Sequence, residues 1–292
     1  MASLLCTVLI VVLAGTAVFQ AVTYLLWLYE KRRGGAFSAT DDPLRLWTAG
    51  LSEWFAFLVV VLGWPMGVFG KPKPRPGGDL RPVVLIHGWS LNRASMAMLA
   101  ARLRKDGRDV YAINYPSMLS DTDAKSEAVA KTLLEIAAAY GGRHVDVVAH
   151  SLGGVVTRAA ARFHGADQVL GNVVTLGSPH CGTALAILVR SFGLVQLRPE
   201  SRFLSRLLEA EEENDPAKEP FSLTSIASSF DAVVFPHDLS FPPGAFCVTL
   251  EGYGHHGLLF AQRVYQLVKE NLDAPEAAER HKPEGEQSAS VD

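Results

Sequence analysis

From residue 80 onward, short apolar runs alternate with stretches of helical spacing, and this alternation limits the folds that the chain can adopt. The apolar runs, rich in Val and of strand length, cover residues 83–86, 110–113, 145–149 and 169–176. Helical spacing follows at residues 91–104, 123–140 and 152–163. Continuous apolar strands that alternate with helices indicate an α/β fold, with a mostly parallel sheet and helices on both faces. Ligand sites in such sheets lie at the carboxyl ends of the strands.

The first 29 residues contain no charged side chain, although 20% of the whole chain is charged. As a helix rising ~1.5 Å per residue, they exceed the ~30 Å thickness of a hydrocarbon layer. Aromatic rings and then the basic residues Lys31, Arg32 and Arg33 follow at the far end, as at a membrane interface. We interpret residues 2–29 as an uncleaved transmembrane helix. A cleavable signal peptide is the alternative, but no basic residue precedes the apolar run.

A second apolar stretch, residues 54–70, has 17 residues without charge and is interrupted by Gly63 and Pro65. It could complete a transmembrane hairpin or lie in the interface beside the first helix. A basic, Pro- and Gly-rich linker follows at residues 71–80. We therefore predict a membrane anchor over residues 1–70 and a globular domain after the linker.

The basic residues suggest a topology for this anchor in an inner or plasma membrane. They follow the first helix and none precedes it, which places the loop 30–53 in the cytoplasm. If residues 54–70 span, the globular domain lies on the periplasmic or outer side, and we favour this hairpin. If they stay in the interface, the domain is cytoplasmic. In both cases we expect the functional residues to lie after residue 80 and the anchor to be dispensable for their chemistry.

The sequence AHSLGG at residues 149–154 stands between the third predicted strand and the helix after it. This placement fits a nucleophile elbow, a tight turn that projects a serine Oγ above the sheet. Small neighbours are needed because the turn brings backbone segments together, and Gly153 supplies one. Ala149 stands where the usual G-x-S-x-G pattern has its first glycine. Ser151 is thus the candidate nucleophile.

A serine needs a base to remove its proton, and in this fold the chain order is Ser, then Asp or Glu, then His. Two further predicted strands, 223–227 and 246–250, end in suitable residues. The first is followed by Asp231 and the second by His255, in the required order. Asp238 is an alternative acid, but it lacks the strand-end position.

These motifs together resemble the α/β-hydrolase lipases, and the small bacterial triacylglycerol lipases and their relatives most of all. The resemblance rests on HG at 87–88, AHSLGG at 149–154, SSFD at 228–231 and GHHGLL at 254–259, and it spans about residues 82–270. It implies that Ser151 is the nucleophile, Asp231 the acid and His255 the base. It also implies an oxyanion hole formed by the backbone N–H groups of Trp89 and Leu152.

We place the hydrolase domain at residues 81–272 and expect a disordered tail at 273–292. Residues 184–219 exceed what a minimal strand–helix unit needs. They could form a lid or a wall of the acyl pocket, or only one ordinary amphipathic helix. His180 could line the pocket or could contact the residues that line it.

The sequence therefore predicts a membrane-anchored serine hydrolase that cleaves carboxylic esters, in particular lipid acyl esters, through an acyl-enzyme. This mechanism implies no metal or organic cofactor, and the three cysteines form no CxxC or Cys/His cluster that would suggest zinc. A net charge of −3 gives no support for nucleic-acid binding. An acyltransferase or a thioesterase would use the same triad. A non-catalytic membrane protein with the hydrolase fold would have lost a triad member or an oxyanion element.

Overall fold

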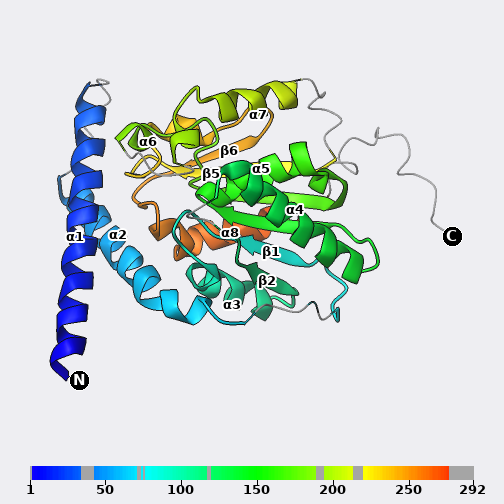
Figure 1. Cartoon of the computed structure of the whole chain (residues 1–292), viewed down its shortest axis with the longest axis horizontal. Helices are drawn as coiled ribbons and strands as arrows, with labels where there is room; N and C mark the ends of the chain where they lie inside the picture. Colours follow the sequence, from blue (N-terminus) through cyan, green and yellow to red (C-terminus); the bar gives the residue numbers. More distant parts are fainter. Residues whose placement is uncertain are drawn as a thin grey trace.

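The computed structural model describes residues 2–33, 43–70, 74, 76–116, 120–188, 194–212 and 220–275. Within these ranges, parallel strands form a six-stranded sheet in the order β2-β1-β3-β4-β5-β6 (Figure 1). The strands are β1 (Val83–Ile86), β2 (Val110–Ile113), β3 (Val145–His150), β4 (Leu170–Leu176), β5 (Ser222–Ser228) and β6 (Phe246–Leu250). The predicted parallel sheet is confirmed, and each predicted strand lies within one residue of the observed one at either end.

Helices cover both faces of this sheet, as predicted. On one face lie α4 (Thr122–Ala139) and α5 (Leu152–His164), and on the other lie α3 (Ala97–Lys105) and α8 (Gln262–Leu272). The Asp121 side chain accepts a hydrogen bond from the Ala124 N–H and so caps the start of α4. The predicted helix at 91–104 instead begins with a 3-10 turn, η2 (Arg93–Met96), which the Asn92 side chain caps.

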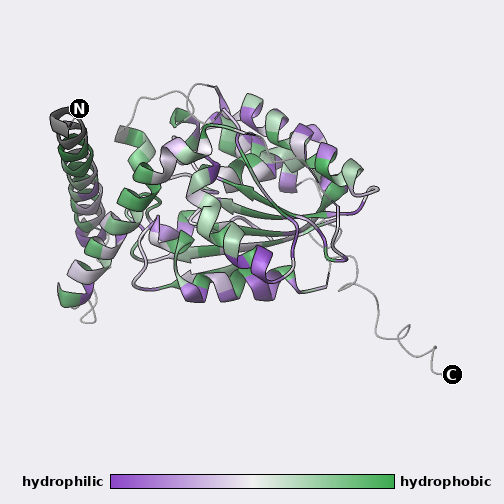
Figure 2. Ribbon diagram, turned by 90° about the horizontal axis from the view of Figure 1, so that it is seen from below, coloured by the Kyte–Doolittle hydropathy of each residue, from purple (hydrophilic) through white to green (hydrophobic). Residues whose placement is uncertain are grey.

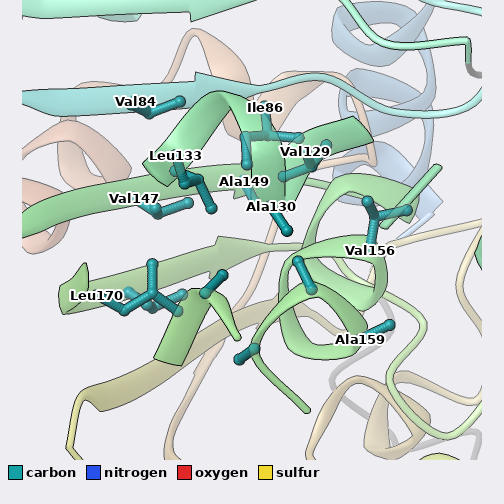
Figure 3. Close-up of a cluster of buried hydrophobic side chains, with 14 of the residues drawn as sticks. Val84, Ile86, Val129, Ala130, Leu133, Val147, Ala149, Val156, Ala159 and Leu170 are labelled. Atoms are coloured by element: carbon teal, nitrogen blue, oxygen red, sulfur yellow. The ribbon is translucent and has the colours of Figure 1, made fainter. Parts of the chain in front are cut away.

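The core follows from the alternation of side chains along each strand. Val84 and Ile86 of β1 point toward α4 and α5, where they pack with Val129 and Leu133 (Figure 3). Their neighbours in β1 pack on the α3 and α8 side. Strands β1, β3 and β4 are therefore buried on both faces, whereas the edge strand β6 is partly exposed.

Two long helices, α1 (Ala2–Arg33) and α2 (Pro43–Gly63), lie side by side at one end of the domain (Figure 1). Each contains a segment long and apolar enough to cross a membrane, Leu9–Tyr29 and Leu44–Gly67, by length and composition alone. Hydrophobic residues run along both helices (Figure 2). The second helix begins at Pro43, well before the predicted apolar stretch. It ends at Gly63 and continues as a 3-10 turn, η1 (Trp64–Gly67).

Both helices are attached to the rest of the protein. The Trp27 ring of α1 stacks on Phe230 with centroids 5.8 Å apart. The η1 turn is bound through its carbonyl groups, since Asn92 Nδ2 donates to the Trp64 O at 2.7 Å and Asn114 Nδ2 donates to the Gly67 O at 2.8 Å. The amino-terminal segment therefore contacts the rest of the protein at Trp27 and through the η1 turn.

The predicted insertion at 184–219 contains α6 (Leu185–Leu188), η4 (Val195–Leu197) and α7 (Arg202–Glu212). Helix α7 buries Leu204 and Leu207 and is bound to α5 by an ion pair between Arg158 and Glu211. Residues 189–193 and 213–219 lie outside the described ranges, as do 71–73 and 75 of the predicted linker.

The predicted tail begins with three described residues that contact the domain. Asp273 pairs with Arg108, and the Ala274 O accepts a hydrogen bond from Asn172 Nδ2 at 2.8 Å. The remainder of the predicted tail, 276–292, lies outside the described residues.

Candidate active site

Ser151 occupies a sharp turn between β3 and α5. Its backbone has φ 55° and ψ −128°. Residues other than glycine rarely adopt this conformation, which costs about 1–3 kcal/mol. The turn fits because Gly153 has no side chain: a Cβ there would lie 2.7 Å from the Ile86 and His87 carbonyl oxygens. This geometry is that of a nucleophile elbow.

Asp231 and His255 meet behind this turn, although each follows a different strand. His255 Nδ1 donates to Asp231 Oδ2 at 2.7 Å, and both side chains are almost fully buried. The other carboxylate oxygen, Oδ1, accepts hydrogen bonds from the Val233 and Val234 N–H groups, each at 2.8 Å. The carboxylate is thus fixed in orientation and in turn fixes the imidazole.

Opposing effects act on the pKa of His255. Burial lowers it, whereas the charge and hydrogen bond of Asp231 and the charge of Glu53 raise it, and its net position is above the ordinary value of 6.5. The Asp231 hydrogen bond also requires the proton on Nδ1, which leaves Nε2 as the basic nitrogen. The imidazole is therefore fixed in orientation, with Nε2 free of the Asp231 bond.

The other candidates from the sequence lie elsewhere. The Asp238 carboxylate is exposed and its side chain contacts His237, not His255. His180 is fully buried, where it accepts from Arg158 and donates to Thr175 Oγ1, and burial and the Arg158 charge hold its pKa well below the ordinary value. His180 therefore contacts Arg158 and Thr175 and not the cavity, and Asp231 is the carboxylate that binds His255.

The loop after β1 lies beside Ser151. A Cβ on Gly88 would approach the Ser151 Cβ to 2.9 Å, so glycine permits this close approach. The next residue, Trp89, and Leu152, the first residue of α5, both border the same space as Ser151. The Leu152 N–H belongs to the first turn of a helix, where backbone donors lack an intrahelical acceptor.

These residues surround one cavity of about 430 Å³. Ser151, His255, Trp89 and Leu152 line it, and Asp231 stands behind His255. Its remaining wall is mostly apolar and includes Leu91, Pro179, Leu185, Ala186, Leu194, Leu197, Val233 and Val234. The predicted insertion thus contributes to the wall. The cavity suits a substrate with one polar reacting group and an apolar chain.

The amino-terminal helices also reach this cavity. Phe19 of α1 and Phe57 of α2 line it, with their rings 5.2 Å apart. Glu53 of α2 is buried and accepts hydrogen bonds from His256 and Gly257, in the loop that carries His255. Residues before position 80 therefore line the cavity and bind the loop of His255, whereas the predicted catalytic residues all lie after it.

Sequence reasoning missed Glu53 because its partners lie more than two hundred positions away. The signal that could have found it is a lone carboxylate inside an otherwise apolar helix, since such a group must have a partner. The predicted stretch began one residue later, at Trp54, and so excluded it.

Within the described ranges, no group of three or more His, Cys, Asp or Glu side chains is arranged to hold a metal ion.

Comparisons with known proteins agree with this fold. The sequence profile of the alpha/beta hydrolase family matches residues 83–285. Triacylglycerol lipases from Pseudarthrobacter phenanthrenivorans and Burkholderia plantarii are each 28% identical over 117 residues. These matches cover 37% of this chain and 36% and 32% of the two lipases, so they span about a third of the relatives' length.

Solved structures share the fold. The mature lipase BlEst2 of Bacillus licheniformis superposes with a TM-score of 0.59 at 20% identity, covering 70% of this chain and 96% of that one. Lipase B of Aspergillus fumigatus superposes with a TM-score of 0.59 at 19% identity, covering 71% and 56%. The predicted resemblance to α/β-hydrolase lipases is confirmed.

Proposed function

Since the chain belongs to the alpha/beta hydrolase family, we propose that it is a membrane-associated serine hydrolase that cleaves lipid acyl esters. The observation that carries the proposal is the single cavity bordered by Ser151 in its strained turn and by His255, which is held by Asp231. A non-catalytic protein would have no reason to keep this combination, because the strained backbone costs stability.

In the proposed mechanism, His255 Nε2 takes the Ser151 hydroxyl proton as Oγ attacks the ester carbonyl. The new C–O bond gives a tetrahedral oxyanion. When it collapses, the bond to the alcohol breaks, and the alcohol leaves with the proton from His255. Water then attacks the acyl-enzyme, again with His255 as base, which releases the carboxylic acid and restores Ser151.

We assign the oxyanion hole to the Trp89 and Leu152 N–H groups. Both residues border the cavity beside Ser151, one from the loop after β1 and one from the first turn of α5. Donors fixed in this way are worth ~3–4 kcal/mol each in comparable sites, because they need no reorganisation when charge develops.

A lipid substrate is supported by the apolar cavity wall and by the similarity to lipases. Phe19 of α1 and Phe57 of α2 line the cavity, so an acyl chain bound there would contact both helices. These are the same helices that are long and apolar enough to cross a membrane. The head group and the chain length are set by the shape of this wall.

Membrane association is supported by the surface of these helices. Most of the large apolar side chains that the described residues expose lie on α1, α2 and residues 64–69. They include Ile10, Val11, Val18, Leu25, Trp47, Met66 and Phe69. Many exposed apolar side chains on one pair of helices mark a membrane or a protein contact. We propose a lipid surface, because the cavity is at the same end of the molecule.

The proposal is tested with the full-length protein in detergent micelles and a series of p-nitrophenyl esters of increasing chain length. We expect hydrolysis of several members, and we expect Ser151→Ala to abolish it while the circular-dichroism spectrum stays unchanged. Hydrolysis that survives Ser151→Ala, or its absence in the wild type for every ester, would contradict the proposal.

A further inference from the structure

Glu53 lies in the middle of α2, yet its carboxylate is bound by the loop that carries the catalytic histidine. Its Oε1 accepts hydrogen bonds from the His256 N–H at 2.8 Å and from His256 Nδ1 at 2.7 Å. Its Oε2 accepts from the Gly257 N–H at 2.8 Å. All three donors belong to the two residues that directly follow His255.

The loop is shaped to receive this carboxylate. A Cβ on Gly254 would lie 2.3 Å from Glu53 Oε2, so glycine is required for the carboxylate to come this close. One turn further along α2, the Phe57 ring packs on the His256 ring with centroids 4.6 Å apart. Helix α2 therefore holds His256 by both a charged and an aromatic side chain.

A buried carboxylate is a costly way to pack a helix. Glu53 is only 4% exposed, and removing a charge from water costs several kcal/mol unless hydrogen bonds replace the lost hydration. An apolar side chain of similar volume would pack α2 on the domain without that cost. The benefit of the carboxylate must therefore lie in the specific donors that it orients.

His255 is then held from three directions. Asp231 accepts from its Nδ1, and His150 Nε2 donates to its backbone carbonyl at 3.1 Å. Glu53 fixes the backbone that follows it. Loss of the Glu53 contacts would leave two buried N–H groups without an acceptor and free one side of the loop.

On this basis we infer that Glu53 is a positioning residue for the catalytic base: from α2 it orients the 255–257 loop, so that His255 meets Ser151 in the reactive geometry. The inference rests on the proposed function, in which His255 is the base. It extends the catalytic machinery into the amino-terminal helix pair, so that correct seating of α2 on the domain becomes a requirement for activity.

Glu53 also acts on His255 through its charge. The groups that surround the His255 ring are Asp231, Glu53, His150 and His256, with the His150 and His256 ring centroids 4.6 and 5.1 Å away. The Glu53 charge raises the pKa of His255 together with Asp231. Neutralising Glu53 should therefore lower the pKa of His255 and move the acid limb of the pH–rate profile to lower pH.

The test compares Glu53→Gln and Glu53→Ala with Ser52→Ala in the full-length protein in detergent micelles. Ser52 is the neighbouring residue on α2, is exposed, and bonds only to the Ala49 carbonyl of its own helix in the described structure, so it is a matched control. For each variant, kcat and KM for p-nitrophenyl butyrate and the rate of fluorophosphonate labelling are measured across pH. Ser151→Ala is measured in parallel.

Glu53→Gln keeps the shape of the side chain but presents an NH2 group to one of the loop donors. We expect kcat/KM to fall about tenfold to hundredfold through kcat, because a displacement of about 1 Å in a catalytic group can cost about 100-fold. The labelling rate should fall in parallel, the acid limb should move to lower pH, and Ser52→Ala should match the wild type.

The inference is wrong if both Glu53 variants retain the kcat and the acid limb of the Ser52→Ala control. This holds even if their melting temperature falls, because a lower melting temperature alone would show a purely structural role. If Glu53→Ala does not fold, Glu53→Gln alone decides. If neither variant folds while Ser52→Ala does, Glu53 serves only the stability of the fold and the inference is wrong. Activity that persists in Ser151→Ala would instead overturn the proposed function.

Discussion

The imidazole of His255 donates from Nδ1 to Oδ2 of Asp231 across 2.7 Å, in a place that water barely reaches. The two residues are separated by β6 and meet only because β5 and β6 are parallel neighbours whose carboxyl ends lie together. Their contact fixes which nitrogen of His255 is basic, and the proposed chemistry depends on it.

This contact predicts a specific pH dependence. The pKa of His255 is raised above 6.5, and only the neutral imidazole can accept the serine proton, so kcat/KM should fall as pH drops through a value above 6.5. The stability contribution has the opposite trend: it is complete below the unfolded pKa and is lost as pH rises through the folded pKa. A pH series of initial rates and of thermal unfolding checks both.

Asp231→Asn provides the variant for this prediction. It should lower kcat by about 10⁴-fold, as loss of the carboxylate does in comparable triads, and shift the remaining acid limb to lower pH. An unchanged limb would mean that another group titrates in this range.

The adjacent histidines should differ in their effects on catalysis. His255→Ala should lower kcat by several orders of magnitude, because it removes the base. His256→Ala should have a much smaller effect, because its side chain donates to Glu53 and lines the cavity without contacting Asp231. Steady-state kinetics on one soluble ester would decide, and the reverse ranking would move the base to His256.

The first strands were predictable because they are short, mostly apolar runs bounded by turn residues, as at Val83–Ile86. The positions of Ser151, Asp231 and His255 were predictable because the fold places catalytic residues at strand ends in a fixed order. Glu53 was not, because hydrogen bonds to a distant loop leave no local pattern. The start of α2 at Pro43 was missed for a related reason: its first turns are not purely apolar, and they form a helix by packing against α1.

The close packing of the turn at Gly153 leads to a prediction about the stability of the fold. Gly153→Ala would place a Cβ 2.7 Å from two carbonyl oxygens that cannot move without displacing β1. We expect a loss of about 1–3 kcal/mol in unfolding free energy, as for other overpacked sites, together with loss of activity. Gly63→Ala is the matched control, because a Cβ there meets nothing within 4 Å. Melting temperatures of both variants check the ranking, and equal melting temperatures would argue against the close packing of the elbow.

The aromatic wall predicts an effect on chain-length preference. Phe57 lines the cavity, so Phe57→Ala should enlarge it and shift the preferred p-nitrophenyl ester toward longer chains. Phe55 is 55% exposed on the same helix and serves as the control. A shift of the optimum in Phe55→Ala, or in neither variant, would show that the acyl chain does not pass between α2 and the domain.

The most direct test of the central claim is active-site labelling of the full-length protein with a fluorophosphonate, read by intact mass and peptide mapping. The structure predicts a single adduct on the peptide that contains Ser151. Ser151→Ala should abolish it, and His255→Ala should slow it by orders of magnitude. No adduct on the folded wild-type protein, or an adduct on another serine that survives Ser151→Ala, would contradict the assignment of Ser151 as the nucleophile.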